Sequence, residues 1–391
     1  MALQQGRGLV SRPQPLARGT SSSEKITGKA IKTGMEKQEI LRWLRTTGED
    51  RLSRLWQMAD QARRRHVGQD VHLRGLIEIS NHCSRRCGYC GLNVHNSSIG
   101  RYRMTDDEIV ACAHQASALG YGTVVMQAGE DPGIGKQWMH DLIRRIKRET
   151  DLAVTLSLGE RPDEELCSWF DAGADRYLLR FETSRRSLYD SIHPPLAGTM
   201  SDRIALLRRL KLFGYEIGSG VMIGIPGQTY DDLATDILLF KELDLDMIGV
   251  GPFIPHQATP LGRPDQVAYA VPAEQVPNSE EMTYKVIALS RLLCLRANIP
   301  STTALATINS ESGRELGLSR GANVVMPNVT PGAYRALYEI YPSKACVDET
   351  AADFGSGLVR RIRSMGRTIG RGRGDSPNLS GRKSRTSEVL P

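Results

Sequence analysis

Apolar, β-branched runs alternate with amphipathic stretches along most of the chain, and this alternation limits the possible folds more than any other feature. Alternating strands and helices are typical of a parallel sheet covered by helices. The predicted strands are eight runs, at 74–80, 122–127, 153–158, 176–181, 217–223, 247–253, 301–307 and 322–326. The predicted helices begin after Thr105 and otherwise cover 136–149, 162–172, 201–213, 229–243, 279–297 and about 311–318.

The span of these units has the length of one (β/α)8 barrel. Polar residues gather after the predicted strands, at the end where such barrels build their sites. We therefore expect a complete (β/α)8 TIM-type barrel, with a partial barrel of about six strands as the alternative. The expected parts are a disordered extension at 1–34, N-terminal helices at 35–70, the barrel at 71–355 and a disordered basic tail at 356–391.

Basic charge is concentrated at the two ends of the chain. Residues 1–34 hold six basic residues and one acidic residue, and residues 356–391 hold nine and two, whereas the whole chain has a net charge of +7. The region between them is therefore acidic. Basic ends rich in Gly, Ser and Arg are typical of solvated disorder, and contact with nucleic acid or an acidic partner is the alternative.

Localisation is predicted from the same features. No apolar run approaches the length of about 20 residues that a membrane span needs. An odd number of cysteines, seven in all, argues against a secreted disulfide framework and favours a reducing compartment. The cytoplasm is expected. The Arg- and Ser-containing, acid-poor start also resembles a transit peptide, so an anaerobic organelle or a plastid stroma is the alternative.

Three cysteines follow the first predicted strand, in the sequence CSRRCGYC at residues 83–90. Thiolates are the soft ligands of zinc and of iron–sulfur clusters. Three thiolates on a 4Fe-4S cube leave one iron open, and an open metal position can activate a small molecule. A structural zinc site is the alternative, with His82 or His95 as a possible fourth ligand. Cys112, Cys167 and Cys294 fall in helical patterns and are predicted to be buried thiols.

This C-x3-C-x2-C spacing, with an aromatic residue before the last cysteine, resembles the radical S-adenosylmethionine (SAM) superfamily. The resemblance implies one 4Fe-4S cluster held by Cys83, Cys87 and Cys90, with SAM chelating the open iron. It also implies reductive cleavage of SAM to a 5′-deoxyadenosyl radical. No catalytic side chain is expected beyond the cluster and SAM.

Polar side chains at the ends of the predicted strands suit such a cofactor. Arg180 and Glu182 share one strand face, and charges inside a barrel are costly unless they are paired or hold a ligand. A guanidinium suits the carboxylate of SAM, and a carboxylate suits its hydroxyl or ammonium groups. Gln127 precedes a glycine turn, and Thr155 and Ser157 share one face of the third strand. A structural ion pair and ordinary packing are the respective alternatives.

Other candidates carry weaker signals. Tyr89 suits either stacking on the adenine or packing against helices, and Arg203 suits either an anion contact or a helix surface. Residues after the last two strands would line the substrate end of the cavity, or else belong to the core. They are Thr302, Thr303, Met326, Tyr338 and Tyr341.

Longer motifs make the resemblance more specific. The stretches NHCSRRCGYCGLN, RYRMTDDEI, MQAGEDPG, LRFETS, GVMIGIPGQT, ANVVMPNVTP and YEIYPSKAC resemble the HydE-type maturases of FeFe-hydrogenase, from about residue 71 to residue 346. The resemblance implies a complete barrel and SAM-dependent processing of the precursor of the dithiolate-bridged di-iron subcluster. It also implies partner maturases and a reductant such as ferredoxin or flavodoxin, with no membrane and no nucleic acid.

One feature departs from the family pattern. Some members carry a second cluster held by three cysteines near the end of the barrel, whereas here only Cys346 is present in that region. We therefore expect a single cluster. The alternatives are a relative of biotin synthase or methylornithine synthase and, in a different class, a metal-binding protein that contacts nucleic acid through its basic arms.

Overall fold

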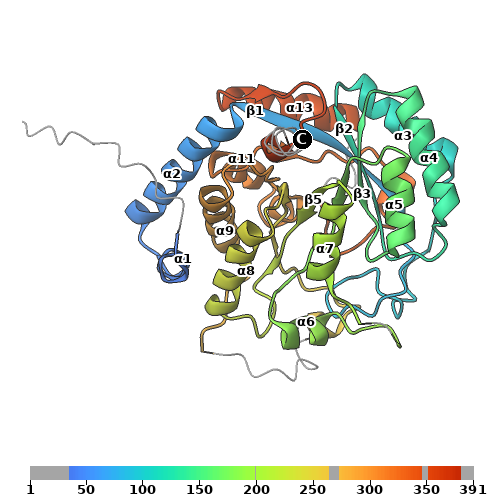
Figure 1. Ribbon diagram of the computed structural model, residues 1–391. Coiled ribbons are helices and arrows are strands. Elements are labelled where there is room, and N and C mark those ends of the chain that lie inside the picture. The colour runs from blue at the N-terminus through green and yellow to red at the C-terminus, as the bar shows by residue number, and fades with distance from the viewer. Residues whose placement is uncertain (1–34, 199, 264–272, 346–350, 380–391) are drawn as a thin grey trace, which may run out of the picture. The chain divides into compact units, whose positions relative to one another are not determined.

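The centre of the molecule is a curled parallel sheet with helices packed outside it (Figure 1). The computed structural model describes residues 35–198, 200–263, 273–345 and 351–379, so the predicted extension at 1–34 lies outside them. The strand order is β10-β1-β2-β3-β4-β5-β7, and β9 also pairs with β1. The strands are β1 (Asp70–Ser80), β2 (Thr123–Ala128), β3 (Ala153–Ser157), β4 (Arg176–Leu178), β5 (Glu216–Ser219), β7 (Met247–Ile248), β9 (Val324–Val325) and β10 (Thr368–Ile369).

Beyond β7 the sheet continues only through isolated parallel bridges. Met247 pairs with Asn298, and Pro300 pairs with Val324 of β9. Pro300 has no N–H to donate, so this segment does not form a regular ladder strand. The described fold is therefore a parallel α/β barrel that is at least partial.

The predicted seventh strand at 301–307 is wrong. This segment forms helix α10 (Thr303–Ile308), with Thr302 as its N-cap residue. The consecutive threonines suggested a strand, but threonine also favours the N-cap position of a helix. The bridging residues of this part of the sheet, Asn298 and Pro300, come just before the predicted run.

Two further predicted strands, 217–223 and 247–253, are each divided in two. After β5 and β7 the chain forms β6 (Met222–Ile223) and β8 (Gly251–Pro252), which pair with each other in a separate small sheet. The break falls where two backbones nearly touch. A Cβ atom on Gly220 would lie 1.7 Å from the carbonyl oxygen of Gly249, so only glycine fits there.

The helices fill the connections between the strands. Capping boxes start α3 at Thr105 and α8 at Thr229. The helices are α3 (Asp106–Ala118), α4 (Lys136–Glu149), α5 (Asp163–Asp171), α6 (Arg186–Ile192), α7 (Arg203–Leu212), α8 (Tyr230–Glu242), α9 (Glu280–Leu293), α11 (Gly313–Ser319), α12 (Gly332–Arg335) and the 3-10 helix η1 (Pro260–Gly262).

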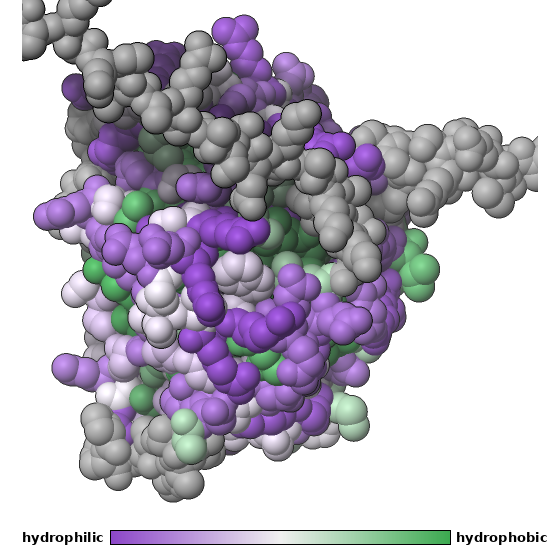
Figure 2. Space-filling view, turned by 90° about the vertical axis from the view of Figure 1, so that its left-hand side faces the viewer, coloured by the Kyte–Doolittle hydropathy of each residue, from purple (hydrophilic) through white to green (hydrophobic). Residues whose placement is uncertain are grey.

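Two helices precede the barrel, as the sequence predicts. Helices α1 (Lys37–Leu44) and α2 (Glu49–Val67) pack against α8 and α9. Their buried faces include Ile40, Leu44 and Leu55, which are fully shielded from solvent. The opposite faces are polar, and the side of the molecule that they cover is mainly hydrophilic (Figure 2).

The predicted disorder of the basic tail at 356–391 is wrong for residues 357–379. The chain forms α13 (Ala351–Ser364) and β10, and β10 extends the sheet beside the start of β1. The following turn lies under the barrel, where Arg74 and Arg176 donate to the carbonyl oxygens of Gly374 and Arg373. Composition suggested disorder, but buried arginines and an open strand edge order the segment.

Candidate cofactor-binding site in the barrel

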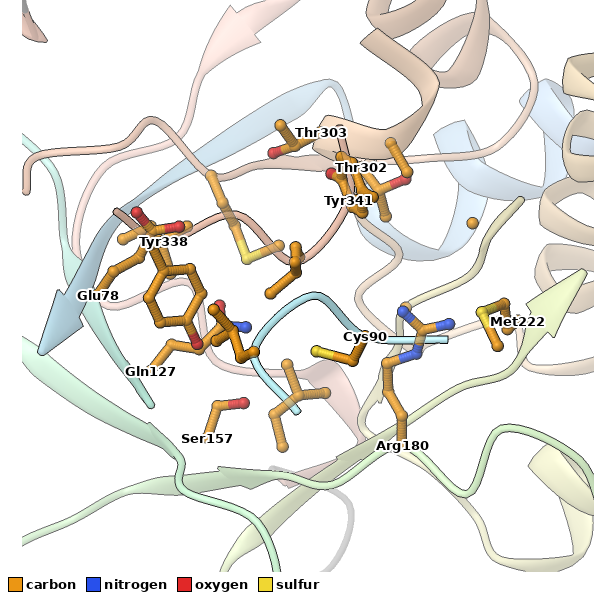
Figure 3. A pocket seen from close by; sticks show the side chains of 18 of the residues that line it. Glu78, Cys90, Gln127, Ser157, Arg180, Met222, Thr302, Thr303, Tyr338 and Tyr341 are labelled. Carbon is orange, nitrogen blue, oxygen red and sulfur yellow. The ribbon is translucent and has the colours of Figure 1, made fainter. Parts of the chain in front are cut away.

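A cavity of about 330 Å³ opens inside the barrel where the strands end, and Figure 3 shows part of its lining. All but one of the predicted site residues line it. The exception is Thr155, which lies two residues deeper than Ser157 on β3, is 1% exposed and has an Oγ1 atom without a hydrogen-bond partner among the described residues. The predicted residues that line the cavity are Cys83, Cys87, Tyr89, Cys90, Gln127, Ser157, Arg180, Glu182, Arg203, Thr302, Thr303, Met326, Tyr338 and Tyr341.

The loop that carries the three cysteines is tightly fixed. Arg101 donates to four carbonyl oxygens within and beside it, those of Asn81, Leu92, Asn93 and Asn96. The backbone N–H of Gly88 donates to Ile192, and that of Gly91 donates to Ile340. A Cβ atom on Gly91 would lie 2.2 Å from the carbonyl oxygen of Glu339, so this contact needs glycine.

The three thiols lie in a buried and mutually repelling group. Burial, and then charge on Cys83, raise the pKa of Cys90 to about 12. Burial also raises the pKa of Cys87 well above its ordinary value, and charges on the other two cysteines add to the effect. Three thiolates therefore cannot be held here without a compensating positive charge, which a metal cluster supplies.

Arg180 and Glu182 follow β4, which ends before them at Leu178. Glu182 takes a left-handed backbone conformation, with φ of 61°, and forms an isolated bridge with Val221. Its Oε2 lies 3.0 Å from Nη2 of Arg180, but neither of these atoms makes a hydrogen bond to the described residues. Backbone strain and unsatisfied charged atoms together are typical of a ligand site.

A charged cluster lies beside the cysteine loop, and the sequence analysis identified only one of its members, Arg203. Arg203 donates from Nη2 to Glu130 and from Nε to Glu160, both at 2.9 Å. Arg85 also pairs with both carboxylates. His193 lies against the same group, with its Nε2 atom 3.2 Å from Arg203. Glu130 and Glu160 come two to three residues after β2 and β3, which is the signal that could have found them.

This charged cluster fixes the ionisation of its members. Burial alone would raise the pKa of Glu160, but the contact with His193, the charge of Arg203 and a hydrogen bond from Ser201 hold it well below its ordinary value. Burial, and then the charge of Arg203, lower the pKa of His193. Arg203 also donates from Nη1 to the carbonyl oxygen of Arg180, so all of its nitrogens have partners in the protein. Its described contacts are those of a positioning residue.

The opposite wall of the cavity holds a second buried ion pair that was missed. Lys344 lies 2.7 Å from Oε1 of Glu78 on β1, and Asn328 donates to the other carboxylate oxygen. Despite these partners, burial raises the pKa of Glu78. The carbonyl oxygen of Tyr338 accepts from Lys344, so the Glu78–Lys344 pair ties the segment 338–345 to the barrel wall.

Tyr89 packs as one of its two expectations has it, whereas stacking on the adenine stays a prediction. It lines the cavity, and it also packs against a small apolar cluster. Thr302 lies at the end of α10 nearest the cavity and donates to the carbonyl oxygen of Val250 at 3.2 Å. The described cavity lining therefore has two sides. The side near the cysteines is charged, and the opposite side combines the Glu78–Lys344 ion pair with hydroxyl, thioether and phenol groups. The apolar cluster comprises Leu188, Ile192, Met222, Ile225, Phe253 and Leu261.

A parallel α/β barrel that brings three cysteine thiols and unsatisfied charges into one cavity defines a radical SAM enzyme, and the profile of the Radical SAM superfamily matches residues 77–240. The chain is 43% identical to the [FeFe] hydrogenase maturase subunit HydE of Thermotoga maritima over 351 residues, which is 88% of this chain and 97% of that protein. It therefore belongs to the HydE family of hydrogenase maturases. Enzymes of this superfamily use a 4Fe-4S cluster and SAM.

More distant proteins share the fold. The 3-methylornithine synthase of Methanosarcina acetivorans is 28% identical over 320 residues, covering 81% of this chain and 85% of that protein. The crystal structure of methylornithine synthase (PylB) matches with a TM-score of 0.73 and 24% identity, over 91% of this chain and 96% of that chain. Among the described residues, no helix is both long and apolar enough for a membrane span.

The residues present fit both cofactors. Cys83, Cys87 and Cys90 offer three soft donors to one cavity. Arg180 and Glu182 offer unsatisfied charged atoms beside them. A Cβ atom on Gly129 would lie 2.3 Å from the carbonyl oxygen of His82, so the glycine turn packs directly against the cysteine loop.

Proposed function

We propose that this chain uses SAM to process the precursor of the dithiolate-bridged di-iron subcluster of FeFe-hydrogenase. The observation that carries the proposal is that the three thiols and the Arg180–Glu182 pair, with its atoms that lack hydrogen bonds, line one cavity. Membership of the HydE family supports the choice of maturation over biotin or methylornithine synthesis, because the matches to those synthases are less similar. The same membership argues against a nucleic-acid-binding protein.

Cys83, Cys87 and Cys90 would hold a single 4Fe-4S cluster and leave one iron for SAM. Bound together and reduced, the cluster and SAM supply a 5′-deoxyadenosyl radical. The protein holds these thiols in place through Arg101 and through the backbone contacts of Gly88 and Gly91. The accessory cluster of some family members is absent in this proposal, as expected from the single Cys346, which lies outside the described residues.

The charged residues would orient SAM. The fork of Arg180 suits the SAM carboxylate, and Glu182 suits the ribose hydroxyls or the ammonium group. Gln127, Ser157 and Tyr89 complete the proposed SAM contacts. Thr155 stays a predicted contact, with an unsatisfied hydroxyl but a position behind the cavity wall. Arg203 acts behind them, because it holds the carbonyl oxygen of Arg180 and two carboxylates.

The far side of the cavity would receive the substrate. Residues with hydroxyl, thioether and phenol groups there can bind a small organometallic or cysteine-derived molecule and exclude water. We further propose that the barrel is complete, because parallel bridges at Asn298 and Pro300 link β7 to β9. The substrate-end residues are Thr302, Thr303, Met326, Tyr338 and Tyr341.

The enzyme would work with other proteins. The proposal includes a reductant such as ferredoxin or flavodoxin and partner maturases, and it places the chain in the cytoplasm, with an organelle as the alternative. It includes no contact with a membrane or nucleic acid. The proposed main domain begins near residue 71, after the N-terminal helices.

The test compares Cys87→Ala with Cys112→Ala in anaerobically reconstituted protein. Cys112 is a matched control because it is a buried thiol on α3 and does not line the cavity. Cys87→Ala should lose 5′-deoxyadenosine release and hydrogenase maturation, whereas Cys112→Ala should keep both. Iron should be near four atoms per chain in the wild type. Activity retained by Cys87→Ala would refute the proposal, and about eight irons would refute the single cluster.

A further inference from the structure

His193 lies directly behind one of the three cysteines. It follows the last residue of α6, is 1% exposed, and places Nδ1 at 3.0 Å from Sγ of Cys87. The cysteine loop and this end of α6 are also joined through the backbone, since Gly88 N–H donates to the carbonyl oxygen of Ile192 at 2.8 Å. The sulfur and the imidazole are therefore held together by two adjacent contacts.

The neighbours of the other ring nitrogen determine which nitrogen carries the proton. Nε2 of His193 lies 3.2 Å from Nη2 of Arg203. A guanidinium can only donate, so the contact with Arg203 favours an accepting Nε2 and places the imidazole proton on Nδ1. Oε1 of Glu160 lies 3.4 Å from the same nitrogen.

Glu160 does not compete strongly for that proton. Its Oε1 atom already accepts from Ser201 at 2.5 Å and from Nε of Arg203 at 2.9 Å. The imidazole ring is further held by Tyr189, whose ring centroid lies 5.1 Å away. The ring is thus fixed with Nδ1–H aimed at the sulfur of Cys87.

We propose that His193 donates an N–H···S hydrogen bond to the thiolate of Cys87 and thereby raises the reduction potential of the cluster held there. The inference rests on the proposed role of Cys87 as a cluster ligand. One-electron reduction adds negative charge that is shared with the thiolate ligands, and a donor aimed at a ligand sulfur stabilises that charge. His193 is a positioning residue in this scheme, because it acts on the cluster through Cys87.

The first test is a redox titration of the reconstituted full-length chain, monitored by the paramagnetic signal of the reduced cluster. His193→Leu removes the donor, and at a fixed potential we expect about a tenfold lower ratio of reduced to oxidised cluster, which corresponds to a midpoint about 59 mV lower. His193→Asn should restore much of the wild-type potential, because its amide can replace Nδ1–H. Tyr189→Phe is the matched control, since it removes a hydroxyl near Glu160 but leaves the contact with Cys87.

A second measurement uses the wild-type protein and so does not depend on a variant that folds. Histidine labelled with 15N should give a weak hyperfine coupling to the reduced cluster, and this coupling should be lost in His193→Asn. A wild-type cluster without such a coupling would overturn the inference, as would a four-iron His193→Leu protein with the wild-type potential. If the wild type itself bound no four-iron cluster, the proposed function would fail instead.

Discussion

Two arginines inside the same barrel, Arg176 and Arg180, differ in what satisfies them. Arg176 begins β4, is fully buried, and donates to Oγ1 of Thr123 and the carbonyl oxygen of Arg373, each at 3.0 Å. It also pairs with Asp375. Arg180 lies four residues later, lines the cavity, and has two nitrogens without a hydrogen-bond partner among the described residues.

The difference separates a closed end of the barrel from an open one. At the closed end, the chain's own C-terminal segment supplies a carbonyl and a carboxylate group to the buried arginine, and Nε of Arg176 makes only an ion pair, 3.3 Å from Glu216. At the open end, the structure leaves polar atoms unsatisfied, a cost that a bound ligand can offset. Arg176 should therefore act on stability, and Arg180 should act on ligand binding.

The largest effect is expected from Arg176→Met. The change leaves Glu216, which is 2% exposed, without its buried cation and leaves Asp375 only its pair with Arg373, so the free energy of unfolding should fall by about 3–5 kcal/mol. Urea unfolding followed by circular dichroism measures this loss. The double variant Arg176→Met Glu216→Leu should recover part of it, because it removes one stranded charge. A loss below about 1 kcal/mol would contradict the role given to Arg176.

Arg180→Met should have little effect on stability and a large effect on ligand binding. The free energy of unfolding should fall by less than about 1 kcal/mol, because the Arg180 side chain is 35% exposed and its removal costs only the partly exposed ion pair with Glu182. Affinity for SAM should fall about 10- to 100-fold, which is about 1.4–2.7 kcal/mol. Calorimetric titration of the reconstituted protein with SAM measures this fall, and Arg180→Lys, which keeps the charge without the fork, should lie between. Unchanged affinity in Arg180→Met would remove Arg180 from the SAM site.

A third case is a buried carboxylate without a cation. Asp236 on α8 accepts from the backbone N–H and hydroxyl of Ser184, and burial raises its pKa to about 7. The folded state then binds a proton that the unfolded state releases between about pH 4 and pH 7, so this residue lowers stability as the pH rises through that window.

Below pH 7, Asp236 should lower the free energy of unfolding by at most about 1.4 kcal/mol for each unit of rising pH. Above pH 7 this dependence on pH should vanish. Unfolding free energies at pH 5, 6 and 8 measure it, and Asp236→Asn should flatten the decline relative to the wild type. Asp375 provides the contrast. Burial would raise the pKa of Asp375, but the charge of Arg176 lowers it. The stability that Asp375 contributes is therefore lost only as the pH falls into the acid range. Equal slopes in the wild type and in Asp236→Asn would show that Asp236 is charged in the folded state.

Local patterns predicted the parts of the molecule that depend on neighbours in sequence. The cysteine loop follows β1 as expected, and strand–helix alternation located most elements, because side-chain periodicity is a local property. The errors come from contacts that are distant in sequence. Residues 357–379 are ordered by contacts with β1 and Arg176, which lie about 200 to 300 positions earlier in the chain. Composition reports none of these contacts, and it therefore suggested disorder.

The candidate site shows the same division. Cys83, Arg180 and Glu182 could be chosen because each stands in a recognisable motif. His193 could not, since its importance depends on contacts with Cys87 and Arg203 across separate loops, and only the position of Glu130 after β2 hinted at that residue. Pairing of this kind has no periodic signal, and only the folded arrangement reveals it.

The smallest effect on stability is expected from an exposed ion pair between an arginine and a glutamate. This pair tests whether burial is the reason why Arg176 stabilises the fold. Arg208 on α7 lies 2.8 Å from Glu242 on α8, and both side chains are more than half exposed. Arg208→Ala should lower the free energy of unfolding by less than about 0.5 kcal/mol, because water and salt screen the pair. The same urea titration used for Arg176→Met measures it, in low and in high salt. A loss comparable to that of Arg176→Met would mean that ion pairing itself, rather than the exclusion of water beneath the barrel, stabilises the closed end.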